Sequence, residues 1–319
     1  MDLDLARIDQ AHRIIDPVFS DTPQYEDPQL RDAVGRRVLV KVETLNPIRS
    51  FKGRGVDFAL HSAEPGSTVV CSSSGNFGQA VAYVGRSRGL HVRVYSPPTV
   101  NEAKRARMEA FGATVVTTGP EASAPRDASR EFAASTPGAV LLEDGREPAI
   151  AEGAGTIGVE LLRSGPVDAV VLPIGDGSLI TGVALWVRHH APGTRIVGVN
   201  PSTAPSMHDS VRAGHPVTAV PTSTFPEGID IPTPHAESVD RVRELVDEIV
   251  LVDEGAMRSA MGLIARHLGV LPEPAGAAGL AAIAGGGIDG SRVATVVTGA
   301  NPSPTTLAAL AAGLADDAR

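Results

Sequence analysis

The amino-acid sequence predicts an α/β protein of two domains, with mostly parallel sheets flanked by helices. Short β-branched runs recur along the chain, and each is followed by Gly-rich turn residues and then by a helical pattern, as in repeated βαβ units. The composition agrees, because aromatic residues make up only 3% of the 319 residues while small and aliphatic residues are abundant. Such a composition is typical of helices that pack closely on parallel strands.

Seven short runs rich in β-branched and apolar residues are predicted to be strands. They are Val38–Val42, Ser67–Cys71, His91–Tyr95, Thr114–Thr117, Ala169–Leu172, Ile196–Val199 and Val293–Val297. The stretch between Leu90 and Gly119 has the order strand, turn, helix and strand, so we expect it to form one βαβ unit. A loop and a surface helix are expected from Glu121 to Pro137.

Charge and cysteine content argue against several classes of protein. The 28 Lys and Arg residues are outnumbered by 37 Asp and Glu residues, so the formal net charge of −9 offers no basic face for nucleic acid. The single cysteine, Cys71, cannot form an internal disulfide, and no Cys/His cluster has metal-ligand spacing. We therefore expect no metal and a cytoplasmic location. No signal peptide is expected, because residues 1–15 alternate charged and apolar residues, and no membrane span is expected, because no apolar run is long enough.

The first segment that points to chemistry is Asn46–Gly55, where Lys52 stands in a Gly-bounded turn between a strand and an apolar helix. A lysine held near apolar groups and a cationic cofactor loses its proton more easily and can form an imine with a carbonyl compound. The alternative is an ordinary solvated loop cation.

The second segment, Cys71–Ala80, places small polar residues directly after a predicted strand and at the start of a helix. Hydroxyl residues and glycine let the amides of a helix N-terminus approach a carboxylate or phosphate closely. The alternative is a serine N-cap with a glycine for the turn.

The third segment, Leu172–Gly182, is a strand that ends in a Gly-rich turn and leads into a helix. It is a candidate phosphate cradle, although it is neither the G-x-G-x-x-G pattern of dinucleotide sites nor a P-loop. The fourth segment, Val296–Asn301, is a buried-looking strand that ends on Thr298 and a glycine. Three of the four segments thus follow predicted strands, where ligands gather in open α/β sheets.

Taken in order, the four segments read S-F-K-G-R-G, S-S-G-N-F-G-Q, P-I-G-D-G-S-L-I-T-G and V-T-G-A-N. They resemble the fold type II pyridoxal-phosphate enzymes, which include serine/threonine dehydratases, serine racemases, threonine synthases and cysteine synthases. The resemblance is strongest to the dehydratase-like group, spans most of the chain, and includes Glu152–Gly158 and Pro272–Ala278. It implies a fold like that of the tryptophan synthase β subunit and pyridoxal 5′-phosphate as cofactor.

Carried onto this sequence, the resemblance implies that Lys52 binds the cofactor as a Schiff base and then removes the substrate α-proton. It further implies that Asn76 binds the phenolic oxygen of the cofactor and that Thr298 faces the pyridine nitrogen. The substrate carboxylate would be bound by Ser73, Ser74 and Asn76. The cofactor phosphate would be bound by the amides of Gly175, Asp176, Gly177 and Ser178. A neutral hydroxyl at Thr298 leaves that nitrogen mostly unprotonated, which makes the ring a weaker electron sink. Elimination or β-replacement is therefore the expected chemistry.

Some residues depart from the family pattern. Phe77 stands where dehydratases of this family often have histidine, and Asp176 stands in a loop that usually has glycine, so we expect the Asp176 carboxylate to point outward or to bind an amide. Asn200 replaces a metal-binding glutamate that racemases of this family commonly have, so no metal site is expected. Ser74 matches a racemase serine that supplies a proton, and its alternative is a helix cap. Glu273 resembles a dehydratase position near the cofactor ring, and its alternative is a solvated turn carboxylate.

These implications lead to one expected function and several alternatives. We expect a large domain of residues 1–44 and 147–319, a small domain of residues 45–146, and a cofactor in the cleft between them. The expected activity is that of a threonine/serine dehydratase-like ammonia-lyase, which converts a small hydroxy amino acid to a 2-oxo acid and ammonia. The alternatives are β-replacement as in cysteine or threonine synthases, racemisation, and a non-catalytic cofactor-binding homologue. A homodimer is expected, because members of this family are commonly dimers.

Overall fold

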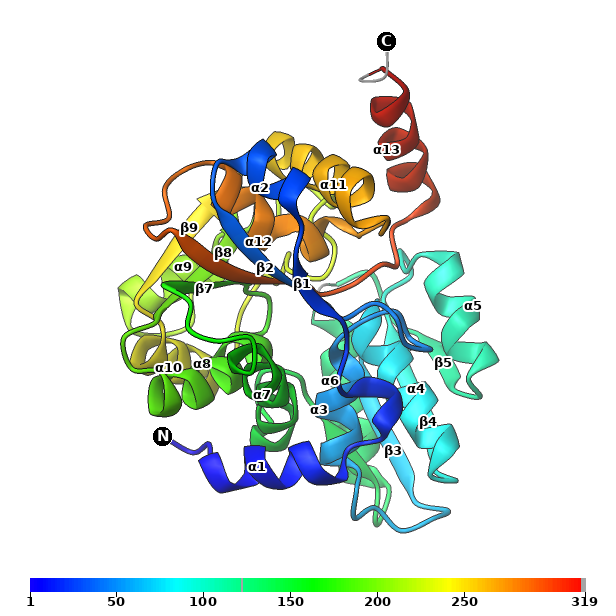
Figure 1. The fold of residues 1–319 in the computed structure, drawn as a ribbon. Helices are drawn as coiled ribbons and strands as arrows, with labels where there is room; N and C mark the ends of the chain where they lie inside the picture. Colours follow the sequence, from blue (N-terminus) through cyan, green and yellow to red (C-terminus); the bar gives the residue numbers. More distant parts are fainter. Residues whose placement is uncertain (122, 317–319) are drawn as a thin grey trace.

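Two sheets flanked by helices make up the protein (Figure 1). The computed structural model describes residues 1–121 and 123–316. Among the described strands every pairing is parallel except that of β1 with β2. The predicted α/β class is therefore confirmed. All seven predicted strands are present, with ends within two residues of those expected.

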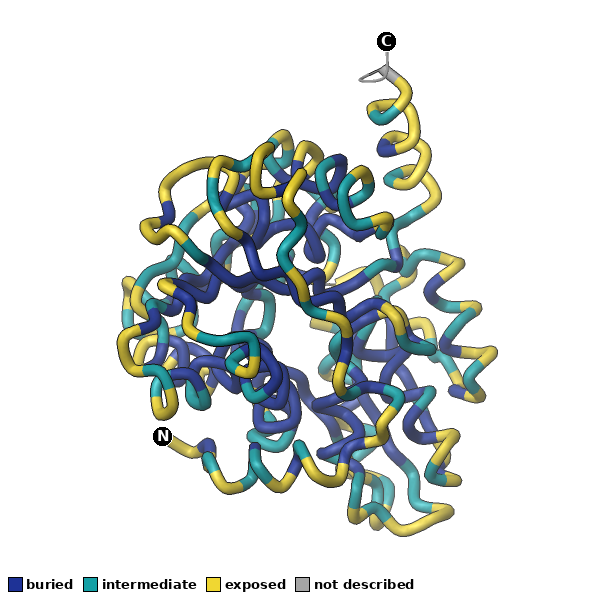
Figure 2. Tube along the Cα trace, in the orientation of Figure 1, coloured by how far each residue is buried: buried dark blue, intermediate teal, exposed yellow. Residues whose placement is uncertain are grey.

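The larger sheet has six strands and is built from both ends of the chain. In spatial order they are β1 (Gln24–Glu26), β2 (Arg37–Val42), β10 (Arg292–Val297), β7 (Ala169–Pro173), β8 (Arg195–Pro201) and β9 (Glu248–Val252). Its central strands are buried on both faces, as Figure 2 shows by their dark blue trace. Along β2, for example, Val38 and Val40 pack on one face while Leu39 packs on the other. Burial on both faces explains why these strands are continuous apolar runs.

Helices cover both faces of this sheet (Figure 1). One face carries α2 (Pro28–Val34), α11 (Glu254–Leu268) and α12 (Pro274–Ala284). The other face carries α7 (Pro148–Leu162), α8 (Ser178–His190) and α10 (Ala236–Leu245). Helices α7 and α8 approach so closely that a Cβ atom on Gly182 would lie 1.8 Å from the carbonyl oxygen of Ala151. The high content of small residues therefore serves helix packing.

The smaller sheet has four parallel strands, all between residues 68 and 142. In spatial order they are β5 (Thr114–Thr117), β4 (His91–Ser96), β3 (Thr68–Ser72) and β6 (Val140–Leu142). Its helices are α3 (Lys52–Ala59), α4 (Asn76–Ser87), α5 (Glu102–Ala110) and α6 (Ala124–Ser135). The order β4, α5, β5 confirms the predicted βαβ unit, and α6 is the surface helix expected in that region.

The remaining elements lie at the chain ends and at the edge of the larger sheet. They are α1 (Leu5–Ile14), a 3₁₀-helix (Pro17–Phe19), α9 (Ser206–Ala213) and α13 (Pro304–Asp316). Helix α13 projects from the body of the molecule (Figure 1). In the described part of the chain, no helix has the length and apolar character needed to cross a membrane.

Candidate active site

The fold brings the four predicted segments to one region. Three of them follow the carboxyl ends of β3, β7 and β10. The Lys52 segment joins them through its backbone, because the Phe51 amide donates to the Thr298 carbonyl oxygen at 3.0 Å and a β-bridge pairs Ser50 with Gly299. Loops from both sheets therefore meet at strand ends, where open α/β sheets bind ligands.

Lys52 is the first residue of α3, and its side chain is only 15% exposed. Its ammonium group forms an ion pair with Oδ2 of Asp144, which lies in the loop between β6 and α7. The other oxygen, Oδ1, accepts a hydrogen bond from Ser178 Oγ at 2.7 Å. Burial alone would raise the pKa of Asp144, but the Lys52 charge and these hydrogen bonds hold it below its ordinary value. Asp144 thus links the lysine to the start of α8.

The segment that was predicted to cradle phosphate forms a tight turn between β7 and α8. Gly177 precedes the helix with φ 94°, and a Cβ atom there would lie 2.2 Å from Ser238 Oγ. At Gly175 a Cβ atom would lie 2.7 Å from the carbonyl oxygen of Gly228. Only glycine fits both positions, and the first turn of α8 offers amides that have no partner within the helix. This arrangement suits an anion such as a phosphate group.

Asp176, inside this turn, behaves differently from the expectation. The residue is half-buried, and no donor in the described chain bonds its carboxylate, so the expected hydrogen bond to an amide is absent. Burial raises the pKa of Asp176 to about 7, the Asp144 carboxylate adds to this rise, and the Lys52 ammonium opposes it. The Asp176 backbone oxygen accepts a hydrogen bond from the Ser238 hydroxyl.

In the loop after β3, Ser73 caps the N-terminus of α4. Its Oγ accepts hydrogen bonds from the amides of Gly75 at 3.1 Å and Gly78 at 2.9 Å. Ser74 is exposed, and its hydroxyl has no hydrogen bond within the described residues. The alternative that Ser74 caps α4 is therefore wrong, because its neighbour already accepts those amide protons.

Asn76 is the first residue of α4, and both the nitrogen and the oxygen of its side-chain amide form hydrogen bonds. Its Nδ2 donates to Oε1 of Glu273, and its Oδ1 accepts from Asn301 Nδ2 at 2.9 Å. Asn301 also donates to the carbonyl oxygen of Ile48 at 2.8 Å. Glu273 and Asn301 belong to the part of the chain that forms the larger sheet, whereas Asn76 belongs to the smaller one. Their hydrogen bonds fix the orientation of the Asn76 side-chain amide.

Glu273 is 1% exposed, so the alternative of a solvated turn carboxylate is wrong. Its Oε2 has no hydrogen-bond partner in the described structure and lies 3.9 Å from Nζ of Lys104. Lys104 in turn lies 2.5 Å from Glu227 Oε2. Burial raises the pKa of the Glu273 carboxyl, and the Lys104 ammonium opposes that rise. Glu273 is thus part of the region around Asn76.

The structure also gives the burial or the contacts of three other residues named from the sequence. Thr298 is 4% exposed at the end of β10, and its role opposite a pyridine nitrogen stays a prediction. Phe77 packs into the apolar core of the smaller sheet. Asn200 donates to the Ile174 carbonyl oxygen at 2.7 Å and accepts from the His208 amide at 2.8 Å, so both ends of its amide are used within the fold. Among the described residues, no group of three or more acidic, histidine or cysteine side chains is arranged to hold a metal ion.

Sequence reasoning missed Asp144 and Arg126. Asp144 follows a strand of only three residues, so no strand pattern marked its position. Arg126 lies in the first turn of α6, is half-buried, and has no ion pair among the described residues. Its charge reaches Asp176 and lowers the pKa of that carboxyl against the effect of burial. An unpaired, half-buried cation beside the turn is a second feature that suits an anionic ligand.

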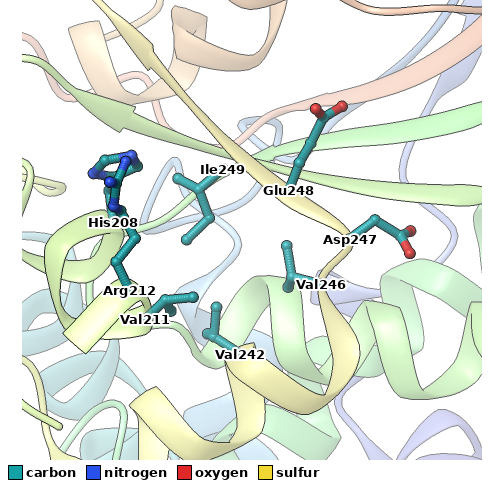
Figure 3. Close-up of a pocket in the computed structure, with 8 residues that line it drawn as sticks. All are labelled: His208, Val211, Arg212, Val242, Val246, Asp247, Glu248 and Ile249. Carbon is teal, nitrogen blue, oxygen red and sulfur yellow. The ribbon is translucent and has the colours of Figure 1, made fainter. Parts of the chain in front are cut away.

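A cavity of about 250 Å³ lies away from these segments, between α9, α10 and the start of β9 (Figure 3). It is lined by His208, Val211, Arg212, Val242, Val246, Asp247, Glu248 and Ile249. Its two carboxylates are engaged, because Asp247 lies 2.6 Å from Arg188 and Glu248 lies 2.5 Å from Arg195. The cavity is at the amino end of β9, so it is separate from the candidate site at the carboxyl ends of the strands.

The residues present fit a cofactor that has both an aldehyde and a phosphate group. Lys52 offers a partly exposed amine, and the glycine turn before α8 offers an anion cradle that the Asp144–Ser178 hydrogen bond connects to it. A cofactor of this kind would thus be held at both ends.

The family model described as pyridoxal-phosphate dependent enzyme matches residues 15–299. The biosynthetic L-threonine dehydratase of Mycobacterium bovis is 33% identical over 307 residues, covering 93% of this chain and 71% of that protein. Serine racemase of Rattus norvegicus is 29% identical over 289 residues, covering 88% of this chain and 86% of that protein. The structure of maize serine racemase matches with a TM-score of 0.90 at 27% identity and covers 100% of both chains. The chain therefore belongs to the pyridoxal-phosphate dependent enzyme family, in the group of serine racemase and threonine dehydratase, and its cofactor is pyridoxal 5′-phosphate.

Proposed function

We propose that the enzyme eliminates water from a small hydroxy amino acid such as serine or threonine, which yields a 2-oxo acid and ammonia, and that Lys52 is the lysine to which the cofactor attaches. The threonine dehydratase similarity supports the reaction class. The observation that carries the proposal is the position of Lys52, whose ammonium is joined through Asp144 to the glycine turn at the start of α8.

The choice of Lys52 is supported by the small number of lysines. The chain contains only three, at positions 41, 52 and 104. Lys41 is fully buried and lies 2.6 Å from Glu160, and Lys104 is paired with Glu227. Lys52 is the most exposed of the three, and it alone adjoins the glycine turn. An amine that reacts with a carbonyl must be reachable and must be able to lose its proton.

The chemistry follows from where these groups lie. When bound, pyridoxal phosphate withdraws electrons from the substrate α-carbon and makes its proton acidic. Lys52 would accept that proton, and Asp144 would hold the lysine amine in place. Ser73, Ser74 and the N-terminus of α4 would bind the substrate carboxylate, while the amides from Gly175 to Ser178 would bind the phosphate.

Two features of this chain support elimination over reactions that need a strong electron sink. The position assigned to the pyridine partner is Thr298, a neutral hydroxyl residue that is nearly fully buried. A neutral partner favours the prompt loss of a β-substituent over a long-lived carbanion. The Lys52 amine is then positioned to return its proton to the departing hydroxide, so that water leaves.

Racemisation is the second candidate, and the free hydroxyl of Ser74 favours it. Ser74 is exposed and makes no hydrogen bond in the described structure, so its proton is not committed to the fold. Serine racemase similarity is comparable to that of threonine dehydratase over this chain. The cytoplasmic location and the homodimer inferred from the sequence stay predictions.

The test is a pair of Lys52 variants. Lys52→Ala and Lys52→Arg should each lower 2-oxo acid formation from L-serine and L-threonine by at least about 10³-fold in a coupled dehydrogenase assay, because neither side chain can attach the cofactor or accept the α-proton. Lys52→Arg keeps a cation beside Asp144 and so serves as the matched control for folding. Borohydride reduction followed by peptide mapping should place the pyridoxyl group on residue 52. Modification of Lys41 or Lys104 instead, or unchanged activity of either variant, would contradict the assignment.

A further inference from the structure

Two carboxyl groups from different loops lie at the glycine turn, one within the turn and one beside it. Asp144 lies between β6 and α7, and Asp176 lies between β7 and α8. The loops touch, because a Cβ atom on Gly145 would lie 2.5 Å from the backbone oxygen of Asp176. Gly145 also donates its amide to Ser178 Oγ at 3.0 Å. Both carboxyl groups therefore stand beside the residues assigned to the cofactor phosphate.

Asp144 has partners that compensate its negative charge, whereas Asp176 does not. Lys52 and Ser178 both bond Asp144, so its carboxylate is fully compensated. No described donor bonds Asp176, and burial together with the Asp144 carboxylate raises the pKa of Asp176 to about 7. The charged groups that shift the pKa of Asp176 are Asp144 and Asp230 from loops, Lys52 from α3, and Arg126 from α6. Two of them oppose its ionisation and two favour it.

A phosphate group bound in the glycine turn would add electrostatic repulsion to an ionised Asp176 carboxylate. Phosphate monoesters lose their second proton with a pKa of about 6, so at neutral pH they bring close to two negative charges. Like charges in a half-buried site repel strongly, and the group with the highest pKa takes up a proton first. Asp176 is that group, whereas Asp144 keeps its charge through Lys52.

We propose that the turn binds the phosphate group of the cofactor together with one proton, which the Asp144–Asp176 pair holds and which Asp176 donates as a hydrogen bond to a phosphate oxygen. This inference rests on the assignment of Gly175 to Ser178 as the phosphate cradle. The proton comes from solvent, and no covalent bond changes. The carboxylic acid then acts as a neutral donor in place of a repelling anion.

Pyridoxine 5′-phosphate is the suitable probe, because it carries the phosphate group but has no aldehyde to react with Lys52. Its binding can be measured by calorimetry at pH 8 in two buffers of different ionisation enthalpy, which gives the number of protons taken up. The parent protein, freed of its cofactor, should take up close to one proton more than the Asp176 variants, because Asp176 is mostly ionised before binding at that pH and any proton exchanged by the pyridine ring of the probe is common to all of them. Its affinity should accordingly fall by up to tenfold per pH unit above about pH 7.

Variants of Asp176 decide the source of the proton. Asp176→Asn and Asp176→Gly should bind the probe with about one proton fewer than the parent and with a smaller change of affinity between pH 7 and 8.5. Asp176→Gly is the second variant in case asparagine disturbs the turn. Asp289→Asn is the control, because the Asp289 side chain is 95% exposed, and it should take up a proton like the parent.

The outcomes separate this inference from the proposed function. Equal proton exchange by the parent and either Asp176 variant would overturn the shared proton while the attachment of cofactor to Lys52 still stood. Failure of the parent protein to bind the probe would overturn the phosphate cradle itself, and the inference with it.

Discussion

Ser74 is the residue at which elimination and racemisation can be separated. Its hydroxyl is exposed and free of hydrogen bonds in the described structure, while Ser73 performs the capping of α4. Ser74→Ala should therefore lower the formation of D-serine from L-serine by about 10²-fold, because a proton donor is lost. Pyruvate formation should change by less than about threefold, because Lys52 still accepts the α-proton. Chiral chromatography and a coupled dehydrogenase assay on the same samples measure both products.

The control for this variant is Ser87→Ala, at the far end of the same helix, where the hydroxyl donates to the Val84 carbonyl oxygen. It should leave both products unchanged. Equal losses of D-serine and pyruvate in Ser74→Ala would mean that Ser74 binds substrate and does not transfer a proton. No D-serine from the parent protein would leave elimination as the sole activity.

The sequence predicted the groups that lie in local motifs and missed their distant partners. Lys52 was recognisable because glycines and a helix start surround it. Asp144 was not, because its ion pair with Lys52 joins residues 92 positions apart. The bond between Asn76 and Glu273 spans 197 positions. Side-chain pairs of this kind are set by how loops meet in three dimensions, and no spacing rule records them.

A buried ionic cluster anchors α3, the helix that begins with Lys52. Arg54, two residues further on, is fully buried and bonds Glu43 after β2 and Glu160 on α7 at 2.6–2.9 Å. Lys41 adds a second cation at 2.6 Å from Glu160. Two cations and two anions thus hold the helix to the larger sheet. Buried charges are stable only while each keeps its partner.

Removal of Arg54 should therefore be costly. Arg54→Ala should lower the free energy of unfolding by about 3–5 kcal/mol, because two carboxylates lose their main partner inside the protein. Arg37→Ala removes an ion pair between the exposed Arg37 side chain and Glu26, and it should cost far less. Urea unfolding followed by circular dichroism measures both. A cost for Arg54→Ala as small as that for Arg37→Ala would show that the cluster does not stabilise the fold.

The same cluster predicts the response to acid. Burial alone would raise the pKa of Glu160, but the hydrogen bonds and charge of Arg54 outweigh it and lower the pKa from 4.5 to about 2. A folded-state pKa below the unfolded value stabilises the protein above about pH 4.5, and this contribution is lost as the pH falls toward about 2. In Arg54→Ala the loss of stability across this range should be smaller. Unfolding curves measured at several pH values test the difference.

The strands that the sequence did not predict share a physical reason. The strands β1 and β6 have only three residues each, too few for an alternation to be recognised. The strand β9 is longer, but it lies at the edge of its sheet and is mostly half-buried, so its pattern is weaker than that of the central strands. The central strands were predictable because burial on both faces requires continuous apolar runs.

The candidate active site joins the two sheets. Sheet membership changes between β2 and β3 and again between β6 and β7, and the predicted boundaries at 44/45 and 146/147 fall in those connections. Asn76 of the smaller sheet bonds Glu273 and Asn301 of the larger one. The sequence predicted that the loops gather at strand ends, but it could not give the strand order that brings both ends of the chain to one site. The boundaries themselves stay a prediction.

A site shared by two sheets should stabilise both of them when the cofactor binds. A ligand that binds only the folded state raises the free energy of unfolding by about 2.7 kcal/mol at 100 times its dissociation constant. Each sheet has a natural probe, because the chain has one tryptophan, Trp186 in α8, and one cysteine, the buried Cys71 in β3. Burial raises the pKa of the Cys71 thiol to about 12, so it should react with thiol reagents only after its sheet opens.

Added pyridoxal phosphate should therefore shift Trp186 fluorescence and Cys71 labelling to higher urea concentration together. The shift should be smaller in Lys52→Arg, where the cofactor binds without attachment. Movement of the Trp186 transition alone would mean that the smaller sheet unfolds independently of the bound cofactor. In that case the contacts of Asn76 with Glu273 and Asn301 would not couple the two sheets, and the site would belong to the larger sheet alone.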